Sequence, residues 1–153
     1  MIRITSDAIN PVEVLESVKS KKAGASVLFV GTTRQFTGEK ETLQLEYECY
    51  ESMALEKIQQ LVDVARSKWN IVQCSIVHRI GVVGLGDSSI VVAVSTGHRQ
   101  ESFEAAVWLV DQLKIQVPIW KKEFWANGNT EWVHPSADQW QVPKNINSDR
   151  GAF

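Results

Sequence analysis

The chain has 153 residues, of which 44% are hydrophobic and 22% are charged, and its formal net charge is −2. This length and composition are typical of one soluble globular domain with a real core. The slight acidic excess argues against a general polyanion binder, so we expect no nucleic-acid partner, and any anion site must be a local pocket.

The N-terminal segment lacks a basic stretch followed by a long apolar run, and no apolar run approaches the ~20 residues needed to span a bilayer. We therefore expect a cytoplasmic protein without a membrane partner. Cys49 and Cys74 form neither a CxxC motif nor a zinc spacing with the three histidines. We expect two buried, reduced thiols, no metal site and no sulfur donor within the chain.

The first third of the chain predicts a strand, a short helix and a second strand. Residues 2–5 alternate as an edge strand, and Asn10 with Pro11 is typical of a helix cap and first turn. Residues 25–32 predict a strand buried on both faces, and residues 33–41 predict a polar loop. The helix would pack through one apolar face and end in three lysines: Val12, Leu15 and Val18, then Lys19, Lys21 and Lys22.

The middle third predicts a strand over residues 43–50, a long helix capped by Ser52, and strands over 74–81 and 89–96 joined through a turn at 84–87. The long helix shows one apolar face, formed by Met53, Leu55, Ile58, Leu61, Val62, Ala65 and Trp69.

The last third predicts a helix over residues 101–117, which Pro118 ends, and a hairpin of residues 119–125 and 131–134. Lys114 falls near the middle of the helix's apolar stripe. A buried ammonium needs a negative partner or an anionic ligand, although position alone favours a lysine that extends to the rim of the core. The stripe consists of Phe103, Ala106, Val107, Val110, Leu113 and Val117.

These elements predict an α+β fold built on a largely antiparallel sheet, with flanking helices and a small β-hairpin subdomain. We expect a single domain over residues 1–135. Residues 136–153 show no periodic pattern and predict a C-terminal tail that is flexible or ordered by a partner.

Cationic side chains follow three of the predicted elements. Arg34 follows one strand, His98 and Arg99 follow another, and Lys114 and Lys121 lie beyond. Arginine binds phosphate through a planar fork and lysine acts as a point charge. Each position alone is weak evidence, because a single arginine is usually solvated and a single histidine usually caps or packs. Together, with hydroxyls from Thr32 and Thr33, they predict a pocket for an anionic small molecule.

Lys121 and Lys122 are neighbours in a predicted strand and therefore point to opposite faces, so at most one of them can join Lys114. The pattern does not decide which, although we favour an exposed Lys122 with Glu123 as its partner. Two lysines in one site lower each other's pKa, which suits proton transfer near neutral pH. For His78 and Arg79 we favour a core ring and an exposed guanidinium, and the tryptophans of the last third could form a docking surface.

Four segments in order resemble the family of the large, catalytic subunit of molybdopterin synthase: FVGTTR (29–34), VHRIG (77–81), STGHRQESFEA (95–105) and LKIQVPIWKKE (113–123). The resemblance implies an α/β hammerhead fold, a homodimer, and a small ubiquitin-like subunit docked at each end. That subunit's C-terminal Gly-Gly thiocarboxylate would give its sulfur to cyclic pyranopterin monophosphate, forming the dithiolene of molybdopterin. The resemblance implies no metal or cofactor in the chain itself.

The resemblance also implies roles for individual residues. Arg34, His98 and Arg99 would hold the phosphate and pterin of the substrate. Lys114 would sit where the thiocarboxylate meets the substrate, and Lys121 would assist as a second cation or acid. The remaining site residues would line the pocket: Lys122, Glu123, Thr32 and Thr33.

One position departs from the family pattern. Some members carry an arginine just after the Trp-Val pair that matches Trp132-Val133, and it serves the neighbouring protomer's anion pocket. Ser136 stands there in this chain. Either Lys144 or Arg150 replaces that arginine, or the contact is absent.

Two other functions remain open at this point. A non-catalytic homodimeric docking module for a ubiquitin-like protein would not need a lysine within an apolar stripe. A phosphate-sensing regulator would use Arg34 and Arg99 without the partner's tail.

Overall fold

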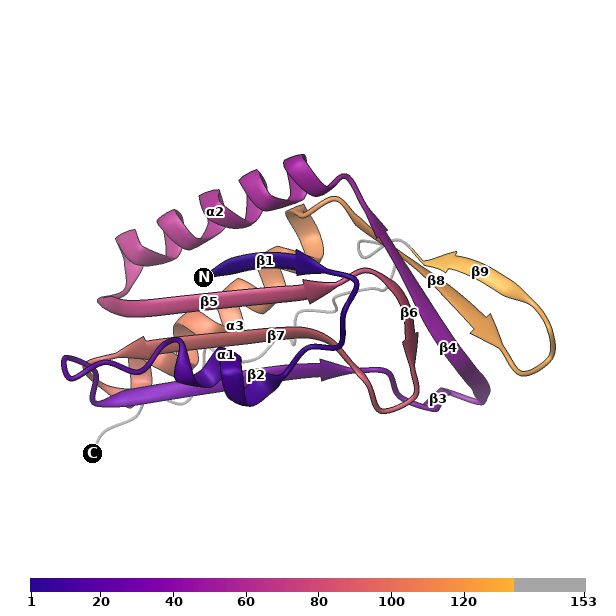
Figure 1. The fold of residues 1–153 in the computed structure, drawn as a ribbon, viewed down its shortest axis with the longest axis horizontal. Helices are drawn as coiled ribbons and strands as arrows, with labels where there is room; N and C mark the ends of the chain where they lie inside the picture. Colours follow the sequence, from indigo (N-terminus) through magenta and orange to yellow (C-terminus); the bar gives the residue numbers. More distant parts are fainter. Residues whose placement is uncertain (134–153) are drawn as a thin grey trace, which may run out of the picture.

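The computed structural model describes residues 1–133 as a four-stranded sheet with helices on both faces, joined to a second, five-stranded sheet (Figure 1). The elements in chain order are β1 (Ile2–Thr5), α1 (Pro11–Glu16), β2 (Ala25–Thr32), β3 (Phe36–Thr37), β4 (Lys40–Cys49), α2 (Glu51–Lys68), β5 (Ile71–Arg79), β6 (Gly81–Gly84), β7 (Ser88–Thr96), α3 (Arg99–Gln116), β8 (Ile119–Trp125) and β9 (Thr130–Val133). The expected tail over 136–153, with Ser136, Lys144 and Arg150, lies outside the described residues, as does the domain boundary at 135.

The four-stranded sheet has the order β1-β5-β7-β2. β1 pairs in parallel with β5, whereas β7 is antiparallel to both of its neighbours. The edge strand expected at residues 2–5 is confirmed. The prediction that residues 25–32 are buried on both faces is confirmed only in part. Val27 and Phe29 pack against one core and Leu28 and Val30 against the other, but β2 is the opposite edge strand and none of its side chains is fully buried. Full burial belongs to the inner strand β7.

Helices α2 and α3 pack on one face of this sheet and the short α1 packs on the other. The larger core lies between α2, α3 and the sheet, and includes Ile58, Ile76 and Leu109. The smaller core places Val14 and Val18 against Val77 and Val91. This layering confirms the expected α+β fold with flanking helices.

Two details of the predicted helices are wrong. The α1 cap is confirmed, since the Asn10 Oδ1 accepts a hydrogen bond from the Val12 amide at 3.0 Å. The helix, however, stops at Glu16, and it buries Val14 while Val12 is exposed. In α2 the capping position is Tyr50, which makes no side-chain cap bond, so Ser52 lies inside the helix. The helix therefore starts two residues earlier than predicted, after the extended backbone of Tyr50.

The second sheet contains β3, β4, β8 and β9, and β6 also pairs with β4. Residues 33–41, predicted as a loop, contain β3 and the start of β4, which turn back through Gly38 at a φ of 62°. An irregularity between Thr42 and Gln44 interrupts the pairing of β4 with β8. It buries Thr42 and leaves Leu43 exposed, against the simple alternation expected from the sequence.

The hairpin expected after Pro118 is confirmed as β8 and β9, with Gly128 in the turn at a φ of 86°. Within residues 1–133, no helix has the length and apolar character that a membrane crossing requires.

Candidate active site

Three of the predicted cations are carried to the end of the four-stranded sheet at which the second sheet begins (Figure 1). β2 ends at Thr32, two residues before Arg34. α3 runs back along β2 and β7 and ends two residues after Lys114, and β8 then carries Lys121 into the second sheet. We call this the near end of the sheet.

His98 and Arg99 lie at the opposite end of the same sheet, which we call the far end. β7 ends at Thr96, which pairs with Ala25 at the start of β2, whereas Thr32 pairs with Ser88 at the start of β7. Seven residues of extended strand separate these two pairs, which corresponds to about 23 Å. A single chain therefore does not bring Arg34 together with His98 and Arg99 in one small pocket, contrary to the expectation from the sequence.

Lys114 is exposed and does not lie within the buried stripe of α3. The helix instead buries Ser102, Ala105, Ala106, Leu109 and Leu113. The small residues allow a close approach to the sheet, and the buried Ser102 is satisfied by the Thr96 hydroxyl at 2.7 Å. Phe103 and Val107, which the pattern placed inside, are 59% and 61% exposed. The helical wheel ranked the residues of α3 by hydrophobicity alone. In the structure, the small side chains of Ser102, Ala105 and Ala106 also lie on the face that packs against the sheet.

The two adjacent lysines of β8 lie on different faces of the second sheet. Lys121 shares its face with the buried side chains of Glu123 and Trp125. Lys122 lies on the outer face, where its Nζ is 5.2 Å from the Phe124 ring centre and 5.7 Å from that of Trp132. The structure thus places Lys121, and not Lys122, on the inner side.

Glu123 is a buried carboxylate, only 5% exposed. Its Oε1 accepts a hydrogen bond of 2.7 Å from the Thr42 hydroxyl. Within residues 1–133 no ion pair involves Glu123, and the pairing with Lys122 is wrong because the two side chains point to opposite faces. The irregularity in β4 is what brings Thr42 inward to meet this carboxylate.

The residues after β2 combine one fixed and one available side chain. Thr33 is buried, and its backbone is held by the Asp87 carbonyl at 3.1 Å and the Gly86 amide at 2.8 Å. Its hydroxyl has no hydrogen-bond partner in the part of the chain described. Arg34 and Thr32 are exposed, and among residues 1–133 the Arg34 guanidinium makes a single hydrogen bond, which its Nε donates to the Thr37 hydroxyl at 3.4 Å. Arg34 is therefore available to bind an anion.

His78 and Arg79, which the sequence singled out, lie beneath this end together with Tyr47, which sequence reasoning missed. The Tyr47 ring packs edge-on against His78, with ring centres 5.2 Å apart and planes at 72°. His78 is buried as expected, its Nδ1 lies 2.9 Å from the Arg79 carbonyl, and burial lowers its pKa to about 4. Arg79, expected to be exposed, is only 16% exposed and pairs with Asp87 at 3.3 Å. No short motif links these residues; only the strand register does.

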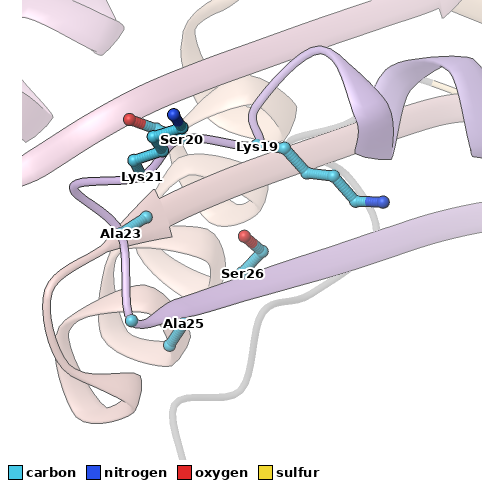
Figure 2. A pocket seen from close by; sticks show the side chains of 7 residues that line it. Lys19, Ser20, Lys21, Ala23, Ala25 and Ser26 are labelled. Atoms are coloured by element: carbon cyan, nitrogen blue, oxygen red, sulfur yellow. The ribbon is translucent and has the colours of Figure 1, made fainter.

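Two cavities lie on the described part of the chain, and neither is lined by Lys114 or Lys121. One, of about 510 Å³, lies at the far end and is lined by residues 19–21 and 23–26 (Figure 2). The Gly24 amide donates to the Thr96 carbonyl there, and a Cβ on Gly24 would lie 2.4 Å from the Gly97 oxygen. The other, of about 320 Å³, is lined by Glu48, Trp120, Trp132 and Val133 on the second sheet.

The two cysteines are poor sulfur nucleophiles. Burial raises the pKa of Cys74 to about 11, and burial with the nearby charge of Glu51 raises the pKa of Cys49. A protonated thiol is a weak nucleophile and a weak metal ligand. Within residues 1–133 no group of three or more His, Cys, Asp or Glu side chains could hold a metal ion.

Comparison with known proteins gives a consistent result. The family model of the MoaE protein matches residues 4–116. The molybdopterin synthase catalytic subunit of Thermoplasma volcanium is 41% identical over 131 residues, covering 86% of this chain and 96% of that protein. The Bacillus subtilis subunit of the same name is 40% identical, covering 85% and 82%.

The fold leads to the same family. The crystal structure of molybdopterin synthase from Staphylococcus aureus superimposes with a TM-score of 0.81 at 36% identity, covering 85% of this chain and 94% of that one. The chain therefore belongs to the MoaE protein family, whose members include the molybdopterin synthase catalytic subunits.

Proposed function

We propose that this chain is the catalytic subunit of a molybdopterin synthase, and that it transfers sulfur from the C-terminal thiocarboxylate of a small ubiquitin-like partner to cyclic pyranopterin monophosphate. Membership of the family supports the enzyme and its place in molybdenum cofactor biosynthesis. The observation that carries the chemistry is the set of cations at the near end: Arg34, Lys114 and Lys121.

These cations suit the charges that such a reaction develops. Opening of the cyclic phosphate and departure of the partner's carboxylate both place negative charge on oxygen, and fixed cations stabilise it. Arg34 would hold the phosphate, Lys114 would meet the thiocarboxylate, and Lys121 would supply a second cation or a proton. Since Lys114 is exposed, a tail delivered by another protein can reach it without entering the core.

The state of the cysteines supports an external sulfur donor. Both thiols have a raised pKa, so neither forms a ready nucleophile. The proposed reaction also needs no metal or cofactor, so a chelator should not slow it.

The separation of the two sheet ends supports a homodimer whose sites are shared between protomers. Arg34 and Arg99 can contact one substrate only if they come from different copies of the chain, because about 23 Å of strand separates them within one copy. We therefore propose that the far end of one protomer supplies His98 and Arg99 to the near end of its partner.

A single-turnover assay tests the function. The purified chain is mixed with cyclic pyranopterin monophosphate and a small subunit bearing the thiocarboxylate, and the dithiolene product is followed through its oxidised fluorescent derivative. We expect product that requires the thiocarboxylate and is lost in Lys114→Ala. Lys57→Ala, which removes a half-buried lysine of α2 outside the candidate site, is the matched control.

The same assay separates the alternatives. A formed complex without product would favour the docking module. Behaviour that is unchanged when the partner's terminal Gly-Gly is deleted would favour the phosphate sensor.

A further inference from the structure

The turn between β6 and β7, at residues 84–87, lies beside the end of β2 at the near end of the sheet (Figure 1). It holds the residue that comes directly before Arg34. The Thr33 amide donates to the Asp87 carbonyl at 3.1 Å, and the Thr33 carbonyl accepts from the Gly86 amide at 2.8 Å. The Thr33 hydroxyl has no hydrogen-bond partner among residues 1–133. Thr33 is therefore held to the turn through its backbone and not through its side chain.

The turn is in its own right tied to the end of β5 by an ion pair. The Nη1 of Arg79 lies 3.3 Å from the Oδ2 of Asp87. The Arg79 side chain is largely buried, and its Nε has no hydrogen-bond partner in the described part of the chain. A guanidinium withdrawn from water is costly without a negative partner, so the pair keeps the Asp87 carboxylate at Arg79.

The Arg34 side chain does little to fix its own position. It is exposed, and the hydrogen bond of its Nε to the Thr37 hydroxyl is long, at 3.4 Å. The backbone is anchored on both sides of it. Thr33 is bonded to the turn on one side, and on the other the Gln35 carbonyl accepts from the Thr42 amide at 2.7 Å. These two anchors set where the guanidinium starts from.

We propose that Arg79 is a positioning residue, which acts through Asp87 and the turn at 84–87 to fix the backbone of Thr33 and thereby the place of Arg34. Each link before the last is a contact between named atoms, and the last is the peptide bond from Thr33 to Arg34. The inference rests on the proposed function, in which Arg34 holds the phosphate, for its kinetic consequence. It does not make Arg79 a group that touches the substrate.

The kinetic test uses Arg79→Gln and Asp87→Asn in the complete synthase. We expect each variant to raise the KM for cyclic pyranopterin monophosphate about tenfold while kcat changes less than about threefold, since a misplaced phosphate contact weakens binding. The effect should be smaller than that of losing Arg34, because the anchor at Gln35 remains. A merely structural role would instead reduce the amount of active protein, which lowers kcat and leaves KM unchanged.

The same two variants separate positioning from a simple effect of charge. Arg79→Gln removes a positive charge near the phosphate, whereas Asp87→Asn removes a negative one. If only the local charge mattered, the two variants would change KM in opposite directions. If the link to Thr33 matters, both raise KM, and the double variant is no worse than either single one.

Two further variants complete the comparison. Arg79→Lys keeps a cation for Asp87 and should bring KM back towards the wild-type value, although an ammonium does not reproduce the planar fork. Arg3→Gln is the matched control, because Arg3 is an exposed arginine of the neighbouring strand β1. It should leave both kinetic constants unchanged.

Amide hydrogen exchange, followed by NMR, tests the structural link without turnover. The Thr33 and Gly86 amides should exchange at least about tenfold faster in Arg79→Gln and Asp87→Asn than in the wild type, because the turn opens more often. The Gly24 amide, which donates to the Thr96 carbonyl at the far end, should exchange as before.

Two results would overturn the inference: unchanged exchange at Thr33 and Gly86 in the folded variants, or KM values that stay at the wild-type level or move in opposite directions. If the wild type itself makes no product, the proposed function fails. The exchange rates still decide whether Arg79 holds Thr33 in place.

Discussion

The two ends of the four-stranded sheet both carry cations, but they are built differently. At the near end, β2, β4, β7, β8 and α3 converge, and side-chain hydrogen bonds join β4 to β8 and β7 to β2. At the far end, His98 and Arg99 are exposed side chains where a short turn leads into α3. Because β2 and β7 are antiparallel neighbours, the residues that follow them lie at opposite ends. Cations that follow two neighbouring strands lie at the same end of a sheet when the strands are parallel, and at opposite ends when they are antiparallel.

The largest expected effect on the transfer rate comes from placing one arginine variant on each protomer of a mixed dimer. We expect Arg34→Ala and Arg99→Ala each to lower the transfer rate by at least about 10²-fold, because each removes a charged contact that the proposed site makes to the phosphate. Co-expression of the two variants with different tags should restore activity in the mixed dimer. If the sites are shared, one of its two sites has both arginines intact, giving about half of the wild-type rate per dimer.

The control is a mixture of the two purified homodimers kept under conditions without subunit exchange, which should stay inactive. A mixed dimer as inactive as its parents would place both arginines in the site from one chain and contradict the shared-site arrangement.

A second experiment sharpens the near end by comparing the two faces of β8. Lys121→Ala should lower kcat by about 10²-fold, the range for loss of a general acid or a site cation. Lys122→Ala, on the outer face with Phe124 and Trp132, should change it no more than a few-fold. Steady-state kinetics of the two variants measure the ratio. An equal loss of kcat in the two variants would mean that the face of β8 on which a lysine lies does not decide which lysine acts.

Sequence reasoning succeeded where local pattern determines structure. The edge strand at residues 2–5, the Asn10 cap and the hairpin at Gly128 all follow from short-range signals, and the structure confirms them. It failed where packing decides. Phe103 is more hydrophobic than Ser102, yet Ser102 is buried because Thr96 satisfies its hydroxyl and α3 lies close to the sheet. No helical wheel contains that contact.

The candidate site shows the same limit. The sequence suggested which cations to consider, and strand alternation stated correctly that Lys121 and Lys122 diverge. Which of them faces inward depends on the pairing of β8 with β4 and on the irregularity at Leu43. Tyr47, the register partner of Lys121, comes from a strand distant in sequence, so no spacing motif could reveal it.

A third experiment compares a buried histidine near one end with the exposed one at the other. The pKa of His78 is lowered to about 4 by burial, so the folded state resists its protonation while the unfolded state does not. Its contribution to stability is complete above about pH 6.5 and is lost as pH falls towards 4, up to about 3 kcal/mol. Chemical denaturation from pH 7 to 4 should show this loss.

His78→Phe keeps an aromatic ring against Tyr47 and should remove that part of the pH dependence. His98→Phe, at an exposed position, should leave the profile of the wild type intact. Identical profiles for all three proteins would show that His78 does not titrate in this way.

The smallest effect concerns the thiols, which belong to neither end. If sulfur arrives from the partner, Cys49→Ala combined with Cys74→Ala should keep the transfer rate within about twofold, at a cost of about 1 kcal/mol in stability. Single-turnover assays and thermal unfolding measure the two quantities. A large loss of transfer in a well-folded double variant would mean that a cysteine carries sulfur.

Helix α3 connects the two ends, since it begins at Arg99 and passes Lys114 two residues before its end. At 1.5 Å per residue, the 15 residues between them set a fixed length of about 22 Å. One inserted residue would turn Lys114 by about 100° around the helix axis relative to Arg99. The number of residues in α3 therefore fixes both the distance and the relative orientation of Arg99 and Lys114.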